Sequence, residues 1–386
     1  PVTPTAPTAT GDNAVAIGSG SISAATNSIA INTGDALYGV IAGATNGIAI
    51  GYQARVRANV TNSIAIGFST DVNNAQSTAV GYNASAFGIG SQAFGSGAYA
   101  ANDRALALGY NTSAGTRGNT ALGVNSGSQG SVTSIGEGAM ALGGSYASGT
   151  DSFAAAIANN TATYGATALS SVAIGALAKA SGSYSVALGY QARASANYAH
   201  ASGYYSLASG AGSFAHGYIG ALESATASGN GAVAFGSGSL ADKQGKYAFS
   251  SDSYWSNATS GIAQYGLMVL RRFTSDGTPG PLVSSSNNTA SAINQVILPN
   301  SSAYSFSGTI VARQKASDGT ASAAWEIKGL IRREANAAST VLVNSALTVL
   351  DNTPAWGLAL TADTTNGGLK IEVTGAAATN IRWVAT

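Results

Sequence analysis

Carboxylates in the C-terminal part of the chain are the first candidates for chemistry. Hydrolysis of a glycosidic bond needs two carboxyl groups that flank the bond, roughly 5 to 9.5 Å apart. Glu326 and Glu334 are expected to share one strand, which would separate them by about 27 Å if the strand runs straight. Glu372 or Asp363 could still approach either of them in the folded chain. A polysaccharide-degrading enzyme is therefore an alternative, but the sequence predicts no catalytic residue and a protein that is not an enzyme.

The two histidines are the most distinctive polar residues of the first 245 positions. His200 and Ser202 stand in "AHASG" where "SVALG" has Val186 and Leu188, and His216 takes the leucine position in "FAHG". If these positions face inward in an oligomer, they form a polar layer in its core. Neutral imidazole is a common metal ligand, so an ion site is one interpretation. Because no carboxylate or cysteine accompanies the histidines, we predict a water-filled polar layer without metal or cofactor.

Two adjacent aromatic residues, Tyr254 and Trp255 in "SDSYWSN", lie in a polar stretch. Aromatic rings with polar neighbours suit the binding of sugars, and such anchors often dominate affinity. We take Tyr254 and Trp255 as candidate receptor-binding residues. The alternative, which we favour, is that Trp255 covers an unpaired strand edge. Trp325 shares a strand face with Ile327 and Ile331, which predicts a core position.

Composition excludes several other classes of protein. The chain of 386 residues has 17 Lys and Arg against 16 Asp and Glu, without the basic cluster that nucleic-acid binding requires. It has no cysteine, which excludes disulfides and thiolate metal sites. The run "FGIGSQAFG" at 87–95 lacks the following helix that a phosphate-binding loop needs. The sequence begins without Met and ends in the strand-like "NIRWVAT", from which we expect a piece of a longer polypeptide.

A short phrase, Ala-(Ile/Val/Leu/Phe)-Gly, recurs through the first 245 residues. Its glycine returns at a constant interval from Gly67 to Gly123 and again from Gly175 to Gly217, where the copies that end at Gly203 and Gly217 are looser. The interval, fourteen positions, suits one coil of a β-solenoid, with two short strands and two turns. A disordered tract rich in Gly, Ser and Ala is the alternative, but the apolar residues keep a strict register.

Side-chain alternation predicts how each coil is built. In "SVALG", Val186 and Leu188 point one way and Ala187 the other, and the glycine fits a tight corner. We expect the larger apolar residues to form an inward face that one coil is too thin to bury. Three chains around an axis would bury this face most simply, so we predict a homotrimer.

The repeated phrases "NGIAIG" at 46–51 and "NSIAIG" at 62–67 resemble the head of YadA-like trimeric autotransporter adhesins. The resemblance covers about residues 11–245 and implies a trimer of left-handed parallel β-rolls. The stretch 124–172 departs from the regular spacing, so the coil boundaries there are open. We predict a linker at 1–10, a YadA-like β-roll at 11–245 and a C-terminal β-sandwich at 246–386.

After residue 245 the small-residue repeat stops and all four tryptophans follow. The sequence predicts an all-β protein throughout, whose second part is an antiparallel β-sandwich of jelly-roll type. Turn signals such as "SDGT" and "TNGG" separate its expected strands. These strands are expected at 263–273, 294–299, 303–314, 323–334, 339–350, 355–362, 368–374 and 380–385.

Residues 247–386 resemble the C-terminal module of bacteriophage and prophage tail fibres, through "AQYGLMVLRR", "NQVILPNSSAYSFSGTIVARQ" and "NGGLKIEVTGAAATNIRWVAT". The resemblance implies a trimeric fibre in the virion that binds a host surface polysaccharide or outer-membrane protein through its tip. Other phage tail proteins would join it through a preceding N-terminal part. The alternative is a bacterial surface adhesin of the trimeric autotransporter type, in which the roll itself binds.

Overall fold

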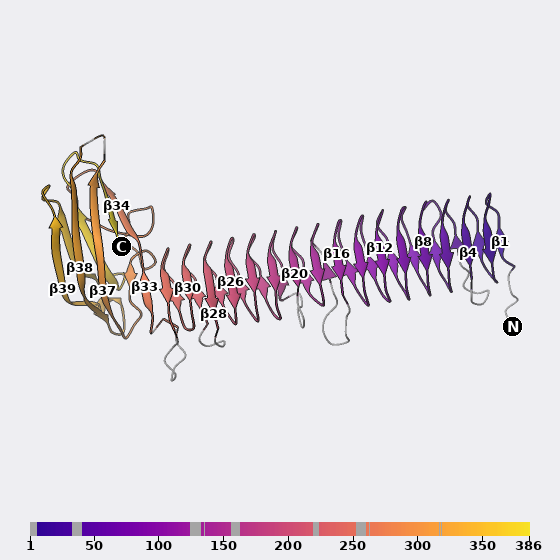
Figure 1. Cartoon of the computed structure of the whole chain (residues 1–386), viewed down its shortest axis with the longest axis horizontal. Helices are drawn as coiled ribbons and strands as arrows, with labels where there is room; N and C mark the ends of the chain where they lie inside the picture. Colours follow the sequence, from indigo (N-terminus) through magenta and orange to yellow (C-terminus); the bar gives the residue numbers. More distant parts are fainter. Residues whose placement is uncertain are drawn as a thin grey trace. The chain divides into compact units, whose positions relative to one another are not determined.

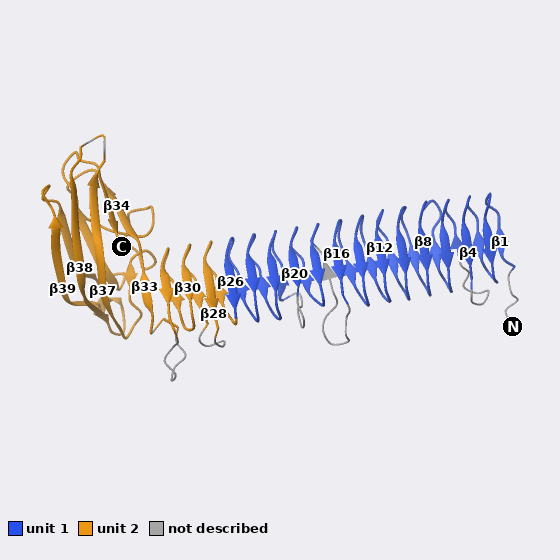
Figure 2. Ribbon diagram, viewed as in Figure 1, with its two compact units in different colours: residues 1–203 blue, residues 204–386 orange. Residues whose placement is uncertain are grey.

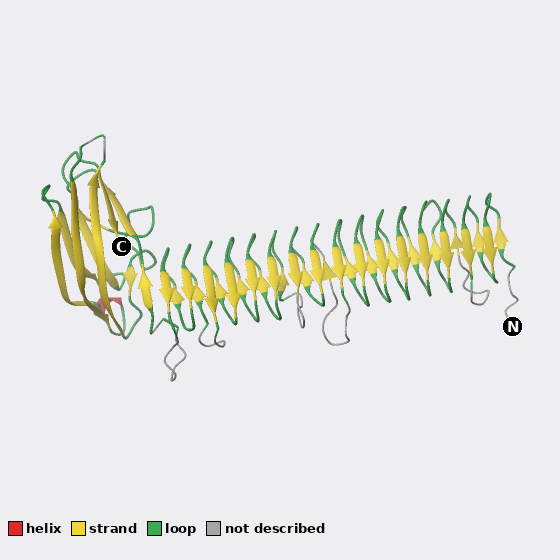
Figure 3. Ribbon diagram, viewed as in Figure 1, coloured by secondary structure: helices red, strands yellow, loops and turns green. Residues whose placement is uncertain are grey.

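The computed structural model describes residues 6–32, 41–123, 133–134, 136–155, 163–218, 224–251, 260–261, 263–315, 317 and 319–386. The chain separates into two compact units, residues 1–203 and residues 204–386 (Figure 2). In the described ranges every named element is a strand except one 3-10 helix, η1 (Ala337–Ser339) (Figure 3). The all-β prediction is thereby confirmed for these residues. No helix among them is long and apolar enough to cross a membrane.

Unit 1 is a stack of coils, each of which adds one strand to each of two parallel sheets (Figure 1). The first sheet holds β2 (Val15–Ile17), β4 (Ile29–Ile31), β6 (Ile48–Ile50), β8 (Ile64–Ile66), β10 (Thr78–Val80), β12 (Gln92–Phe94), β14 (Leu106–Leu108), β16 (Thr120–Leu122), β18 (Met140–Leu142), β20 (Phe153–Ala155), β22 (Val172–Ile174), β24 (Val186–Leu188) and β26 (His200–Gly203). Its strands pair in strict register, so that like positions of successive coils lie side by side.

The second sheet of unit 1 is built from two-residue strands. They are β1 (Thr8–Ala9), β3 (Ile22–Ser23), β5 (Ile41–Ala42), β7 (Arg55–Val56), β9 (Asp71–Val72), β11 (Ser85–Ala86), β13 (Tyr99–Ala100), β15 (Ser113–Ala114), β17 (Thr133–Ser134), β19 (Tyr146–Ala147), β21 (Gly165–Ala166), β23 (Lys179–Ala180) and β25 (Arg193–Ala194). These strands also pair in parallel. The predicted β-solenoid is therefore confirmed, and pairing already includes Thr8 and Ala9, within the stretch predicted as a linker.

Alanine fills the interior of each coil. Ala49, Ala65 and Ala79 stand in the middle of first-sheet strands and are fully buried, and Val56 and Val72 are fully buried on the second-sheet strands. The larger residues on either side of each alanine face out of the coil because side chains alternate along a strand. The larger apolar residues thus form a face that one coil does not bury, as predicted, and the burial of this face between three chains stays a prediction. So short a coil encloses space only for small side chains.

A glycine makes the corner after most first-sheet strands, as the sequence predicted. Gly67 and Gly81 have φ angles of +129° and +139°, which L-amino acids rarely adopt. A Cβ on Gly81 would also overlap the carbonyl oxygen of Gly95 in the next coil. Both conformation and close approach thus require glycine at this corner.

The other turn of the coil explains the "Asn-Ser" that opens the repeat. Asn46 and Asn62 have φ angles of +57° and +58°, a conformation that asparagine tolerates better than most residues. The Asn46 side-chain amide donates to Asn62 Oδ1 at 2.8 Å, so the turns form a ladder of side chains. Ser63 is fully buried, and its hydroxyl donates to the carbonyl of Thr61 at 3.1 Å.

The pairing continues through the irregular stretch 124–172. Ala121, Ala141, Ala154 and Ala173 pair in turn although the sequence intervals between them are unequal. The register of the first sheet is therefore kept while the connecting segments change length. Residues 124–132 and 156–162 of these segments lie outside the described residues.

Unit 2 begins with further coils. In one sheet β28 (Phe214–Gly217), β30 (Val233–Phe235) and β32 (Tyr247–Phe249) pair in parallel, and in the other β27 (Leu207–Ala208), β29 (Thr226–Ala227) and β31 (Leu240–Ala241) do so. The next strand, β33 (Tyr265–Leu267), pairs with β32 in the antiparallel direction. This change of direction ends the parallel pairing.

Two antiparallel sheets make up the rest of unit 2. The larger has the order β34 (Leu270–Thr274), β42 (Ile381–Ala385), β37 (Ser302–Gln314), β38 (Ser322–Arg333) and β39 (Val341–Asp351). The smaller contains β35 (Gly280–Pro281), β36 (Val296–Ile297), β40 (Gly357–Asp363) and β41 (Gly368–Thr374). One hydrophobic core, which includes Trp325, Trp356 and Trp383, contains residues from both sheets. The predicted antiparallel sandwich is therefore present, with Trp325 in its core.

Candidate functional site

The first sheet of unit 1 presents a long apolar surface, which we call the apolar ladder. It consists of the first and third residues of each strand, on the face opposite the buried alanines. Val15, Ile17, Leu108 and Ile174 are 43%, 54%, 47% and 41% exposed, respectively. Most other apolar members of the ladder are less exposed, and polar residues such as Thr78 and Gln92 interrupt it. A surface on which partly exposed apolar side chains recur in this way is typical of an interaction surface rather than of a solvent-facing sheet.

The second sheet presents a mostly polar surface, with exceptions such as Ile22 and Tyr99. Its outward positions include Arg55, Asp71, Ser85, Ser113 and Lys179. These positions alternate with fully buried alanine or valine, as expected when one face of a sheet meets solvent. The roll therefore has two chemically different outer faces.

An arginine pair surrounds one carboxylate on this polar face. Arg55 and Arg57 place guanidinium nitrogens 2.9 and 2.7 Å from Asp71 Oδ2. Burial acts to raise the pKa of the Asp71 carboxyl, but hydrogen bonds and charge from Arg57 and Arg55 outweigh burial and hold the pKa below its usual value. The cluster links adjacent coils, since Arg55 pairs with Asp71 in register.

Aromatic rings stack at the corners of successive coils. The ring centroids of Tyr52 and Phe68, and of Phe68 and Tyr82, lie 5.0 Å apart with nearly parallel planes. Each of these residues follows a corner glycine. The sequence motif "GY" or "GF" thus marks a stacked column, which sequence reasoning did not identify.

The structure places the predicted polar layer on the outward face. His200 pairs with Val186 and Ser202 with Leu188, as the repeat alignment predicted. His200 and Ser202 are half-buried in unit 1, whereas His216 is exposed in unit 2 and its ring centroid lies 6.0 Å from that of Phe235. The assembly of these residues into a layer stays a prediction.

The candidate receptor-binding residues Tyr254 and Trp255 lie outside the described residues. Among the described residues, the side chain of Gln264 pairs with the backbone of β31, the last two-residue strand of the coils. Its Oε1 accepts from the amide of Leu240 at 2.8 Å, and its Nε2 donates to the carbonyl of Leu240 at 3.2 Å. The side-chain amide of Gln264 therefore makes the hydrogen bonds to β31 that a further strand of the second sheet would make. β33 pairs instead with β32 of the first sheet.

Two of the carboxylates considered for hydrolysis, Glu326 and Glu372, do not come together as a pair. Glu326 points to the exposed face of β38, where it alternates with the buried Trp325 and Ile327. Glu372 lies on the outward face of β41 in the other sheet and pairs with Lys370. The two carboxylates therefore project from opposite faces of the sandwich. In the described part of the chain no group of three His, Cys, Asp or Glu residues could hold a metal ion.

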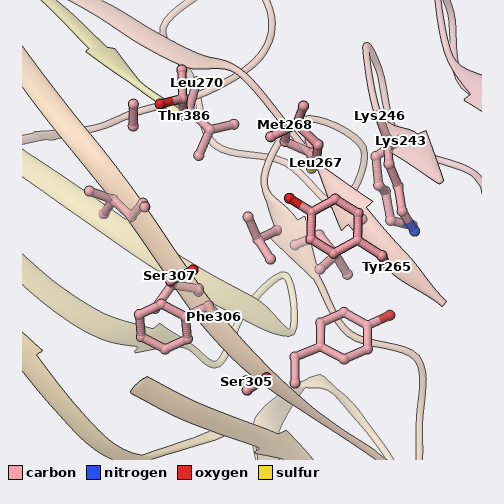
Figure 4. A pocket seen from close by; sticks show the side chains of 18 of the residues that line it. Lys243, Lys246, Tyr265, Leu267, Met268, Leu270, Ser305, Phe306, Ser307 and Thr386 are labelled. Carbon is pink, nitrogen blue, oxygen red and sulfur yellow. The ribbon is translucent and has the colours of Figure 1, made fainter. Parts of the chain in front are cut away.

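Unit 2 contains a cavity of about 570 Å³ (Figure 4). Its apolar lining comes from β33, from the segment after it, and from the inner faces of both sheets of the sandwich. These residues are Leu267, Met268, Leu270, Val296, Ile297, Phe306, Ile327, Leu369 and Ile371. Lys243 and Lys246 lie on one side of the cavity, and Phe306 lies across from them (Figure 4).

Charged groups cluster at the lysine side of this cavity. Asp242 Oδ2 lies 2.5 Å from Lys243 Nζ, and Asp242 Oδ1 lies 3.4 Å from Lys246 Nζ. Burial lowers the pKa of Lys246, an effect that Asp242 partly offsets. Burial acts to raise the pKa of Asp242, but the ammonium groups of Lys246 and Lys243 hold it below its usual value. The single carboxylate of Asp242 thus forms ion pairs with both lysines.

Tyr304 completes the polar part of the cavity wall. Its hydroxyl is buried and has no hydrogen-bond partner. Burial, with a smaller effect from the negative charge of Asp242, raises the pKa of Tyr304 to about 12, so the phenol stays protonated at neutral pH. A buried hydroxyl donor without an acceptor is costly and suggests a missing partner.

Comparison with known protein families agrees with the geometry of the coils. The family described as the YadA head domain repeat matches residues 9–31, 42–70, 61–84, 73–91, 86–112, 166–192 and 223–239. No curated protein matches the chain. The β-solenoid and these matches together establish that the chain contains repeats similar to those of the YadA head.

Proposed function

We propose that the chain is one subunit of a homotrimeric attachment fibre, in which the roll supplies stiffness and the sandwich supplies recognition. The apolar ladder carries this proposal. Its mostly polar counterpart on the second sheet is suited to solvent, whereas the ladder leaves valine, isoleucine and leucine partly exposed on most coils. A protein of the adhesin or fibre class would bury such a surface between its subunits.

Burial of the ladder would be strongly favourable. Covering the exposed half of one isoleucine or leucine is worth on the order of 1 kcal/mol. The ladder repeats along every coil of unit 1, so the total exceeds the cost of bringing chains together. Three identical chains around an axis close such an interface without leaving a free copy of the surface.

Two substitutions in one coil test the trimer. Val80 belongs to the apolar ladder, and Ser85 faces outward from the second sheet of the same coil. We expect sedimentation of the unmodified chain at three times its mass of 37.9 kDa. Val80→Lys should weaken the trimer because it places charge in the interface, whereas Ser85→Lys should leave it intact. A monomeric unmodified chain, or equal effects of the two substitutions, would contradict the proposal.

Within this class we propose a phage tail fibre that attaches the virion to a bacterial surface polysaccharide. The support is the resemblance of residues 247–386 to tail-fibre modules. Several trimers on one particle would raise avidity without new contacts at each site. Labelled full chain should bind host bacteria and block adsorption of the phage, and periodate oxidation of surface glycans should abolish binding. Binding that survives periodate but not protease would point to an outer-membrane protein.

A bacterial surface adhesin is the second candidate, and the matches to the YadA head repeat favour it as strongly. An adhesin would bind animal cells or extracellular matrix through the roll. The two candidates are separated by incubating the labelled chain with bacteria, with cultured animal cells and with immobilised matrix proteins. Binding to matrix alone would replace the viral proposal by the adhesin.

A further inference from the structure

We propose that the cavity of unit 2 binds an amphipathic carboxylate, with its hydrocarbon body between the sheets and its charged head at Lys246 and Tyr304. The proposal concerns a site distinct from the apolar ladder. It does not depend on whether the chain belongs to a virus or to a bacterium.

The shape and lining of the cavity determine the body of the ligand. A volume of about 570 Å³ lies within the usual range of roughly 300 to 1,000 Å³ for small-molecule sites. Leu267, Met268, Val296, Phe306 and Leu369 contribute apolar surface from both sheets and from β33. A saturated or aromatic hydrocarbon fits this lining because neither the hydrocarbon nor the apolar side chains need a hydrogen-bond partner.

The polar groups at one side determine the head. Two ammonium groups, those of Lys243 and Lys246, share the single carboxylate of Asp242, which leaves one positive charge in excess. The side chain of Lys246 is only 9% exposed, so water neutralises this charge poorly. The hydroxyl of Tyr304 adds a buried donor without an acceptor. These groups lack one negatively charged acceptor, which a monovalent carboxylate supplies.

The hydrocarbon and the carboxylate can be tested separately on the full chain without any substitution. Isothermal titration with acetate, hexanoate and decanoate, below micelle-forming concentrations, should give affinity that rises about fourfold per added CH₂ until the cavity is filled. Decanoate should bind with one molecule per chain and more tightly than decanol, while decylamine should bind least. Equal binding of decanoate and decanol would overturn the charged head.

Substitutions locate the binding. Lys246→Met keeps the apolar stem and removes the charge, so decanoate should lose about tenfold or more in affinity while decanol is unchanged. Tyr304→Phe should weaken decanoate by a smaller factor. Lys328→Met, on the exposed face of β38, is the matched control and should change neither ligand. Thermal unfolding of each variant establishes that it is folded.

Three results would reject the site. Decanoate that binds Lys246→Met as well as the unmodified chain is bound elsewhere. Uptake without saturation at one molecule per chain is nonspecific partition. Absence of decanoate binding to the full chain overturns the proposal.

Discussion

Single residues in this protein are chosen for smallness and for backbone conformation rather than for chemistry. Alanine inside the coil and glycine at its corner leave little freedom for substitution, whereas the outward positions accept isoleucine, threonine, glutamine or leucine. The repeat phrase records this difference between inside and outside. The positions that vary least along the repeat are the ones where a larger side chain does not fit.

Two glycines of one coil differ in what a side chain at each position would meet, and their substitution tests backbone conformation against steric contact. Gly81 has φ of +139° and lies against the next coil, whereas Gly90 has φ of +67° with open space where a Cβ would lie. We expect Gly81→Ala to destabilise the chain by at least ~2 kcal/mol and Gly90→Ala by about 1 kcal/mol or less. Gln76 and Arg104 already occupy the turn position of Gly90 in neighbouring coils. Denaturant unfolding of both variants makes the comparison, and equal losses would contradict it.

The carboxyl of Asp71 should make stability depend on acidity. Its folded-state pKa is depressed by Arg57 and Arg55 against the effect of burial, so its contribution is complete above the unfolded pKa of about 4. That contribution is lost as the pH falls through the folded pKa. Thermal midpoints between pH 6 and 2 should therefore drop more steeply for the unmodified chain than for Asp71→Asn. Parallel curves would show that the arginine contacts contribute nothing.

At the scale of elements, the sequence predicted most strands of the sandwich to within a few residues. Alternation defined the runs at 303–314 and 323–334, and the structure has strands at Ser302–Gln314 and Ser322–Arg333. The two-residue strand Gly280–Pro281 was missed because it is too short to alternate. The expected strand at 263–273 is two strands, since β33 pairs with the last coil and β34 with β42. That division depends on partners distant in sequence.

The end of the parallel stack depends on Gln264. Gln264→Ala leaves the amide and carbonyl of Leu240 without their present partners, a loss that costs about 1 to 3 kcal/mol for a buried group. We expect the Leu240 amide to exchange its hydrogen at least tenfold faster in deuterated water, with little change in unit 1. Ser85→Ala, on the outward face of the second sheet, is the control. Unchanged exchange at Leu240 would show that Gln264 does not protect it.

The candidate sites were less accessible to sequence reasoning than the fold. Lys243 and Lys246 are close in sequence, but the cavity beside them also needs Phe306 and Leu369, which fold back from strands far along the chain. The aromatic column at Tyr52, Phe68 and Tyr82 could have been found, because each ring follows a corner glycine. Alternation placed the larger apolar residues opposite the alanines, on a face that one coil is too thin to bury, and the structure leaves this face partly exposed.

At the scale of the whole molecule, a stack of equivalent coils should tolerate the loss of a complete one. Deletion of residues 81–94 joins Val80 to Gly95, which removes one full period and brings equivalent corners together. We expect a folded protein with nearly unchanged circular dichroism per residue. Deletion of residues 81–87 removes half a coil and should abolish cooperative unfolding, because the chain then turns toward the wrong sheet. Equal behaviour of the two deletions would contradict nearest-neighbour stacking.

The fixed register between like positions of successive coils has a consequence for heredity. Gene segments that encode such similar coils can misalign during recombination, and an exchange between equivalent positions adds or removes whole periods. Every product keeps alanine opposite alanine and glycine opposite glycine, as in the pairs Ala79–Ala93 and Ala93–Ala107. The same "GYQAR" at 51–55 and 189–193 is what duplication of this kind leaves behind. A lineage could thus change how many coils it carries by copying errors alone, while point mutation stays free to alter the outward positions.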